Sequence, residues 1–357
     1  MNRYRWVLAI AIAAVIAAVA LVAVFQPSPA DQGAATGSKD VLIPVADRQQ
    51  APEFTGITGW INSPPLQLGT RHTGATLIDF WTYSCVNCVR TVPGLGSLYA
   101  RYGGNGFQIV GVHSPEFDFE KNPDNVRRAV SRLGVTWPVA LDPDMATWNA
   151  WSNQYWPAEY LVDSSNRIAY VHFGEGDQAT LEAAVRELVG PPVTAVVGTS
   201  DKLPGTGISP ELYAGGQTSQ QHQTPLGDGE VLDPSGAAVD LPATAAPAVQ
   251  RDAIEVSGPW RDRGDHLESA GPGHVRLRFH AREVYVVAGS NAGPLRVAVS
   301  LDGRAVDPGA SGSAVSKASA TVAASDLYHL LSAVPAGDHV LDLAVPAGFV
   351  LYTFTFG

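Results

Sequence analysis

Two cysteines, Cys85 and Cys88, are the residues of this sequence best suited to chemistry, and the chain contains no other cysteine. A disulfide that closes so short a loop constrains the unfolded chain little, so stabilisation is a weak reason for the pair. Redox exchange and metal binding remain. A zinc site needs four ligands, and none of the nine histidines forms a second close pair that would complete one. The Cys-x-x-Cys spacing therefore predicts thiol–disulfide exchange, with no bound metal or other cofactor.

The position of the pair assigns a role to each thiol. Residues 75–81 and 107–113 form nearly continuous apolar runs, each typical of a central strand buried on both faces. Cys85 would then open a helix, where backbone N–H groups and the helix dipole favour the thiolate that attacks a disulfide. Cys88, one turn later, would face inward and resolve the mixed disulfide. Because the intervening Val86 and Asn87 supply no positive charge, we expect a reducing rather than a strongly oxidising couple.

Asp79 is a candidate proton-transfer group for this dithiol. Residues 77, 79 and 81 share one face of the predicted strand, so Asp79 would lie between Leu77 and Trp81. A carboxyl desolvated there should have a raised pKa and could exchange a proton with Cys88 during resolution. The alternative is an acid on a solvated face of the sheet, which the large apolar neighbours disfavour.

Two prolines near the pair allow more than one interpretation. Pro93 lies inside the predicted helix and indicates a kink, although Gly94 and Gly96 allow the helix to end there instead. Pro157 precedes a predicted strand at 158–163, and most peptide bonds before a proline are trans.

The patterning of the rest of the chain predicts two domains. Residues 51–190 alternate between strand and helix patterns, which indicates an α/β sheet covered by helices. After residue 250, apolar and polar residues alternate as in a β-sandwich, with Asp302-Gly303 as a hairpin turn. The predicted organisation is a membrane anchor at 1–25, a tether at 26–50, the α/β domain at 51–190, a linker and lead-in at 191–250 and the β-sandwich at 251–357.

The N-terminus carries a predicted transmembrane helix at 6–25, which contains no charged residue. About 20 apolar residues span a bilayer core. Arg3 and Arg5 precede this span and no basic residue follows it before Lys39, which places the N-terminus in the cytoplasm and the domains outside. The alternative is a signal peptide cleaved near residues 28–30, after which the protein would be secreted.

The formal charge of −11 is spread along the chain, which argues against nucleic acid as a partner. Nor does the sequence contain a phosphate-binding Gly-x-x-x-x-Gly-Lys loop.

These features together resemble the thioredoxin superfamily. Asp79, Trp81, Cys85, Cys88 and Pro93 stand at the spacing of that family's buried acid, the tryptophan two residues later, the two cysteines and the helix-kinking proline. The resemblance implies a thioredoxin-like fold for the first domain.

The same resemblance assigns residues that contact the substrate. Pro157 matches the cis-proline that faces the dithiol and helps to hold the substrate's strand. Trp81, Trp156 and Glu116 are expected to contact the substrate beside it.

Within this superfamily the chain looks like the TlpA-like, membrane-tethered branch, and specifically the soluble part of DipZ-type proteins. That family's C-terminal part resembles a carbohydrate-binding or galactose-binding-like sandwich, which the resemblance implies here too. The matching stretches lie at 59–62, 79–88, 113–117, 155–161, 173–177, 284–287 and 352–357.

Two departures from the family pattern limit what is carried over. DipZ-type proteins have a multi-helix domain that conducts electrons, whereas this chain has one apolar span, so a separate membrane electron donor of the CcdA or DsbD type is expected. Thioredoxins of cytochrome c maturation often have an acid where this chain has Thr91, which disfavours that specific role.

The leading hypothesis is a membrane-tethered oxidoreductase that reduces or exchanges disulfides of exported proteins. A peroxiredoxin-like peroxide reductase is one alternative, although Cys85 lacks the usual Pro-x-x-x-Thr/Ser-x-x-Cys context. A cell-envelope glycan-binding protein with an accessory redox domain is the other. Its sugar site would use Trp260, Arg261 and loops around Asp265 and Asn291.

Overall fold

The computed structural model divides the chain into two units, Met1–Val41 and Leu42–Gly357. The predicted span at 6–25 lies outside the described residues. Within the part that the structure describes, no helix is both long and apolar enough to cross a bilayer. The described residues are 41–68, 74–193, 207–224, 233, 235–242 and 249–357.

A six-stranded mixed sheet forms the first half of the second unit. The strands β2 and β3 are buried along their whole length and pair in parallel, as the continuous apolar runs predicted. The order across the sheet is β1 (Gly59–Ile61), β4 (Val139–Leu141), β3 (Phe107–His113), β2 (Ala75–Trp81), β5 (Ala158–Val162) and β6 (Ile168–Phe173).

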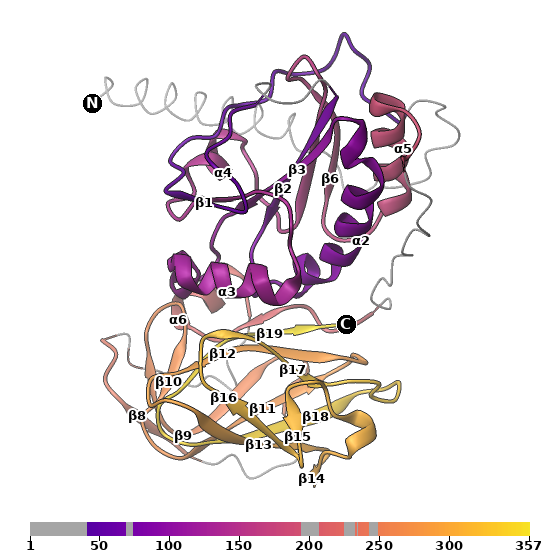
Figure 1. Cartoon of the computed structure of the whole chain (residues 1–357). Coiled ribbons are helices and arrows are strands. Elements are labelled where there is room, and N and C mark those ends of the chain that lie inside the picture. The colour runs from indigo at the N-terminus through magenta and orange to yellow at the C-terminus, as the bar shows by residue number, and fades with distance from the viewer. Residues whose placement is uncertain (1–40, 69–73, 194–206, 225–232, 234, 243–248) are drawn as a thin grey trace, which may run out of the picture. The chain divides into compact units, whose positions relative to one another are not determined.

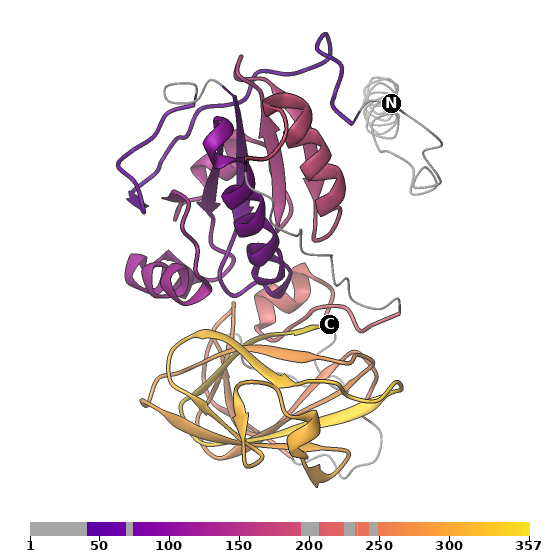
Figure 2. The ribbon, with the colours of Figure 1, turned by 45° about the vertical axis from the view of Figure 1, so that its right-hand side comes forward.

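Helices cover both faces of this sheet (Figures 1 and 2). The helices α2 (Val86–Tyr102) and α5 (Gln178–Val189) pack together on one face. The helix α4 (Ala146–Ala150) lies on the other face. Its residue Trp148 and its C-cap residue Trp151 pack against Ile78 and Phe80 of β2. Pro93 lies inside α2, which continues to Tyr102, so the alternative of a helix end there is excluded. The remaining short elements are η2 (Gly103–Asn105), η3 (Asp118–Lys121) and α3 (Pro123–Leu133).

Residues 42–50, assigned to the tether from their composition, pack against this sheet in the structure. The N–H of Ile43 donates to the carbonyl of Ala169 at 2.8 Å, and the N–H of Ile168 donates to the carbonyl of Gln49 at 2.8 Å. Leu42 is buried. These bonds occupy the free edge of β6, which composition alone does not reveal.

The second half of the unit is a large antiparallel β-structure of 13 strands. Its long strand β9 (Ile254–Asp262) joins two halves, because Ile254–Ser257 pairs with β11 (Gly273–Phe279) and Trp260–Asp262 pairs with β10 (Leu267–Ser269). Eight further strands are β12 (Val284–Ser290), β13 (Leu295–Leu301), β14 (Arg304–Ala305), β15 (Val315–Ser316), β16 (Ser319–Val322), β17 (Asp326–Leu331), β18 (His339–Val345) and β19 (Phe349–Phe356).

One apolar core is shared by both halves of this β-structure and includes the fully buried Leu277 and Phe354. The predicted hairpin at Asp302-Gly303 joins β13 to β14, and both of its residues have positive φ. Three short elements fall in the region predicted as linker: β7 (Leu212–Tyr213) pairs with β19, β8 (Val239–Leu241) pairs with β9, and α6 (Gly216–Gln221) follows β7.

Aromatic and polar side chains connect the α/β sheet domain to the C-terminal β-structure. The Tyr213 hydroxyl donates to Glu116 Oε1 at 2.5 Å. The Tyr352 ring lies 5.1 Å from Phe117 and 4.7 Å from Phe119, centroid to centroid. The segment that follows β3 therefore lies against β7 and β19.

Candidate active site

The two cysteines occupy different environments at the start of α2. Cys85 is the N-cap residue and is partly exposed, and its Sγ accepts a hydrogen bond from the N–H of Cys88 at 3.4 Å. Cys88 is completely buried. Burial, and then the hydrogen bond and charge of Cys85, raise the pKa of the Cys88 thiol. The arrangement therefore exposes one sulfur to a substrate and keeps the other beneath it.

Asp79 lies beneath the dithiol, as the strand alternation predicted. Its side chain is 2% exposed, and burial raises its pKa to about 7. After burial and the effects of Cys85, the charge of Asp79 also raises the pKa of the Cys88 thiol. Oδ1 has no hydrogen-bond partner among the described residues. A carboxyl that titrates near neutral pH beside a buried thiol can take up the proton that the thiol loses.

A second buried carboxyl, Glu159, was not singled out from the sequence. Glu159 is 2% exposed and is paired across β2 and β5 directly opposite Asp79, so both point to the same face. A signal was present, since a glutamate interrupts the otherwise apolar strand Ala158–Val162. Its proximity to Asp79 depends on strand register, which the sequence does not specify.

The peptide bond between Trp156 and Pro157 is cis, as the family resemblance implied. Pro157 is buried, and its carbonyl accepts the N–H of Gly174 at 2.9 Å. The Trp156 indole donates to the carbonyl of Ser114 at 3.0 Å and lies 4.1 Å from the Trp148 ring. Hydrogen bonds from two neighbouring segments thus hold this loop.

The structure differs from expectation for two tryptophans. Trp81 is 2% exposed and packs edge-on against His113 at 5.5 Å, so it supports the sheet and cannot contact a substrate. Trp260 is fully buried and donates to the carbonyl of Ser257 at 2.9 Å, so its ring is not available to a sugar. The resemblance predicted a substrate contact for Trp81 and the sequence a sugar contact for Trp260, and both predictions are wrong because tertiary packing buries the two rings.

A polar bridge ties the first turn of α2 to the segment after β6. Arg90 donates to both carboxylate oxygens of Glu175, at 2.6 and 3.0 Å, and to Asn87 Oδ1 at 2.6 Å. Asn87 lies between the two cysteines. The i to i+3 spacing of Asn87 and Arg90 was the available signal, whereas the contact with Glu175 joins distant parts of the chain.

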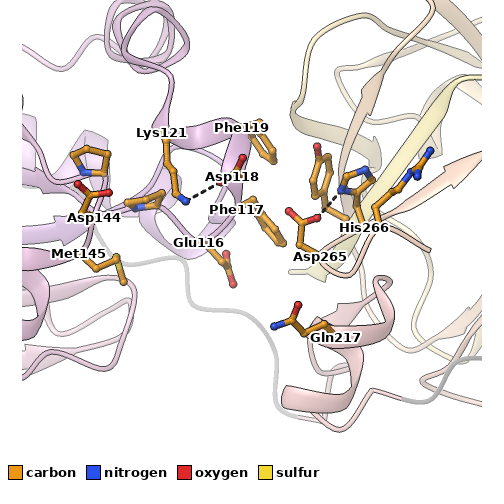
Figure 3. Close-up of a pocket in the computed structure, with 14 residues that line it drawn as sticks. Glu116, Phe117, Asp118, Phe119, Lys121, Asp144, Met145, Gln217, Asp265 and His266 are labelled. Atoms are coloured by element: carbon orange, nitrogen blue, oxygen red, sulfur yellow. Dashed lines mark hydrogen bonds and ion pairs between the residues drawn. The ribbon is translucent and has the colours of Figure 1, made fainter. Parts of the chain in front are cut away.

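Glu116, expected to contact the substrate, is partly buried and bonded to Tyr213. Burial, and then the charges of Glu211 and Glu120, raise its pKa. Glu116 also lines a cavity of about 820 Å³ (Figure 3). Neither cysteine is among the lining residues, which are Pro115, Glu116, Phe117, Asp118, Phe119, Lys121, Pro143, Asp144, Met145, Gln217, Arg263, Asp265, His266 and Tyr352.

Within the described ranges, no cluster of three or more His, Cys, Asp or Glu side chains is arranged to hold a metal ion.

Comparison with known proteins finds a matching family for each half of the chain. Residues 46–188 match the Redoxin family, and residues 209–357 match a family described as a thioredoxin-like C-terminal domain. Over 250 residues the chain is 36% identical to the protein DipZ of Mycobacterium bovis, an alignment that covers 67% of this chain and 35% of DipZ. Residues 46–188 therefore form a thioredoxin-like domain of the Redoxin type, and the chain is a homologue of DipZ over the 250 aligned residues.

Shorter matches reach other relatives of this thioredoxin-like group. The thiol-disulfide oxidoreductase YkuV of Bacillus subtilis is 28% identical over 142 residues, which cover 40% of this chain and 95% of YkuV. The chloroplastic protein SUPPRESSOR OF QUENCHING 1 of Arabidopsis thaliana is 36% identical over 150 residues, 41% of this chain and 14% of that protein. This chain therefore spans about a third of the length of DipZ and less of the plant protein.

The raised pKa of Asp79 predicts how stability depends on pH. Burial makes the folded state favour the neutral form of Asp79. This preference contributes fully to the free energy of unfolding below pH 3.8, which is the pKa of the unfolded state. The contribution is lost as the pH rises to about 7, the pKa in the folded state. Asp79→Asn should match the wild type near pH 4 and exceed its free energy of unfolding at pH 8 by up to about 4 kcal/mol, measured by urea denaturation.

Asp163→Asn is the matched control, with the opposite sign. Although burial opposes it, hydrogen bonds from Arg48 and from the N–H groups of Arg167 and Ser165 lower the pKa of Asp163. Its ionised form stabilises the fold above the unfolded value of 3.8, so Asp163→Asn should lower stability at neutral pH. An Asp79→Asn protein no more stable than wild type at pH 8 would contradict the assignment of a neutral buried acid.

Proposed function

We propose that this protein is an extracytoplasmic, membrane-tethered thiol–disulfide oxidoreductase that reduces or exchanges disulfides of exported proteins. The observation that carries the proposal is the pairing of an accessible Cys85 at the N-cap of α2 with a buried Cys88. The charge of the buried Asp79 carboxyl raises the pKa of Cys88, which supports a role for Asp79 as its proton acceptor. The name and sequence of YkuV, whose length the chain covers almost completely, support the same chemistry.

The reaction runs in two thiol–disulfide exchanges. The Cys85 thiolate attacks one sulfur of the substrate disulfide, so a mixed disulfide forms and the first substrate thiolate leaves. Cys88 then gives its proton to the Asp79 carboxylate and attacks Cys85 Sγ. The Cys85–Cys88 disulfide forms, the second substrate thiolate leaves, and two electrons have passed from the dithiol to the substrate.

The tether and the electron supply are part of the proposal. Arg3, Arg5 and the uncharged residues 6–25 support a single span with the domains outside the cytoplasm. Secretion after signal cleavage would export the same domains. A membrane donor of the CcdA or DsbD type would supply two electrons after each turnover and reduce the Cys85–Cys88 disulfide back to the dithiol.

Two exposed aromatic side chains beside the cis-proline support contact with an unfolded substrate segment. Tyr155 is 52% exposed and Phe173 is 48% exposed, and their ring centroids are 5.0 Å apart. Phe173 precedes Gly174, which bonds to Pro157, and Glu175, which bonds to Arg90 of α2. An apolar side chain near the substrate's cysteine can therefore pack on this pair while its sulfur reaches Cys85.

The first test of the proposal is reduction of insulin disulfides by the full chain. Wild type should turn over with dithiothreitol as donor, and Cys85→Ser should fall to the uncatalysed rate because the attacking sulfur is gone. Cys88→Ser should accumulate a mixed disulfide, visible as a mass increase in non-reducing electrophoresis. Equal turnover by wild type and Cys85→Ser would contradict the proposal, as would peroxide consumption by the reduced protein that outpaces disulfide reduction.

The aromatic pair predicts a separation of binding from chemistry. Replacing Tyr155 and Phe173 together by Ser should raise KM for insulin by about three- to tenfold, with kcat unchanged. Reaction with a small aromatic disulfide should stay at the wild-type rate. Val193→Ser, which removes an equally exposed apolar side chain elsewhere, is the control. An unchanged KM in the double variant would remove the pair from the substrate site.

The cavity favours a second candidate function, binding of a cell-envelope glycan. Rings of Phe119 and Tyr352 lie beside polar groups of Gln217, Asp265 and Arg263 around the space, and such a combination suits a sugar (Figure 3). Calorimetric titration with cell-wall saccharide fragments should give heat that Asp265→Ala abolishes without any loss of insulin reduction. Absence of heat for every fragment would leave the cavity without this role.

A further inference from the structure

The buried carboxyl of Glu120 lies next to the segment that carries Cys85. Glu120 belongs to η3 and is 0% exposed. Its Oε1 accepts hydrogen bonds from the Thr82 hydroxyl at 2.5 Å and the Ser84 hydroxyl at 2.6 Å. Its Oε2 accepts from the N–H groups of Glu116 at 2.7 Å and Phe117 at 3.0 Å.

Four donors converge on this one carboxyl, which is the arrangement that suits its ionised form. An ionised carboxylate can accept all four bonds, whereas a protonated one would have to donate its own hydrogen to the oxygen of the Thr82 or Ser84 hydroxyl and would no longer accept from that hydroxyl. Burial raises the pKa of Glu120, and the bonds from Ser84, Thr82 and the two N–H groups oppose that rise without cancelling it. His113, 3.3 Å from the Thr82 hydroxyl, supplies no positive charge because burial lowers its pKa to about 3.

A carboxylate buried without a cation is costly, and apolar side chains could fill its space at lower cost. The residues that donate hydrogen bonds to Glu120 indicate its role. Thr82 and Ser84 lie between the end of β2 and Cys85, a stretch too short to form regular structure of its own. The hydroxyls of both point to the same carboxylate oxygen.

We propose that Glu120 is a positioning residue of the redox centre, which through Thr82 and Ser84 holds Cys85 in the geometry for attack on a disulfide. The proposal rests on the proposed function of the dithiol. The second oxygen extends the same anchor to Glu116 and Phe117, which contact Tyr213 and Tyr352 of the C-terminal β-structure. Glu120 thus joins the segment before Cys85 to the segment that the β-structure contacts.

The test measures alkylation of Cys85 in the reduced full chain by iodoacetamide across pH, with the midpoint potential of the dithiol and the melting temperature beside it. Ser84→Ala keeps the charge of Glu120 and removes one bond to it, which should slow alkylation at neutral pH about three- to tenfold. Glu120→Gln cannot accept all four bonds and should slow it at least as much. The double variant should be no slower than Glu120→Gln, because Ser84 acts through Glu120.

Asp163→Asn is the control for loss of a buried carboxylate. Asp163 accepts bonds from Arg48 at 2.9 Å and from the N–H groups of Ser165 and Arg167 at 2.8 and 3.0 Å, in the turn between β5 and β6. This variant should lower the melting temperature and leave the rate, its pH profile and the potential unchanged.

A merely structural role for Glu120 predicts a different result. Ser84→Ala and Glu120→Gln would then lower the melting temperature but alkylate with the wild-type rate and pH profile, and this outcome overturns the proposal. Additive effects of the two changes overturn it as well. If Glu120→Gln fails to fold, Ser84→Ala alone decides between the two. Alkylation requires no disulfide substrate, so it reports on Glu120 even if wild type fails to reduce insulin.

Discussion

The packing of the first turn of α2 over the end of β2 is the contact on which the site depends. It removes Cys88 and Asp79 from water together, and this shared desolvation raises the pKa of both groups. Cys85, one turn earlier at the N-cap, stays accessible. A single packing constraint therefore leaves one thiol accessible and buries the other thiol together with the Asp79 carboxyl.

The topology of the sheet explains why distant segments meet at this point. Since β2 and β3 are parallel, their carboxyl ends lie at the same edge, which brings the segment before Cys85 beside the segment that contains Glu120. The antiparallel strand β5 starts from that edge, so Pro157 is placed there too. The end of β6 follows through the bond between Gly174 and Pro157.

The C-terminal β-structure contributes to the surroundings of the site through the segment after β3. Tyr213 bonds to Glu116, and Tyr352 packs on Phe117 and Phe119. The strand that carries Tyr213 lies in the region predicted as linker. The sequence did not predict this strand, because two residues in a Gly- and Ser-rich stretch leave no periodic pattern. The family match that begins at residue 209 agrees with the paired strands and includes this region in the C-terminal domain.

Local patterns by themselves determined the dithiol, the two buried strands on either side of it in the chain and the burial of Asp79. Continuous apolar runs and residue alternation report burial directly, because they act over a few neighbouring residues. The tertiary structure decided the rest: Glu159 opposite Asp79, Glu175 on Arg90 and Glu120 beneath Thr82 and Ser84. Each of these contacts joins segments that register and crossover connections bring together. Trp81 and Trp260 show the converse. The family resemblance suggested that Trp81 contacts the substrate, and residue type suggested that Trp260 contacts a sugar, but three-dimensional packing buries both.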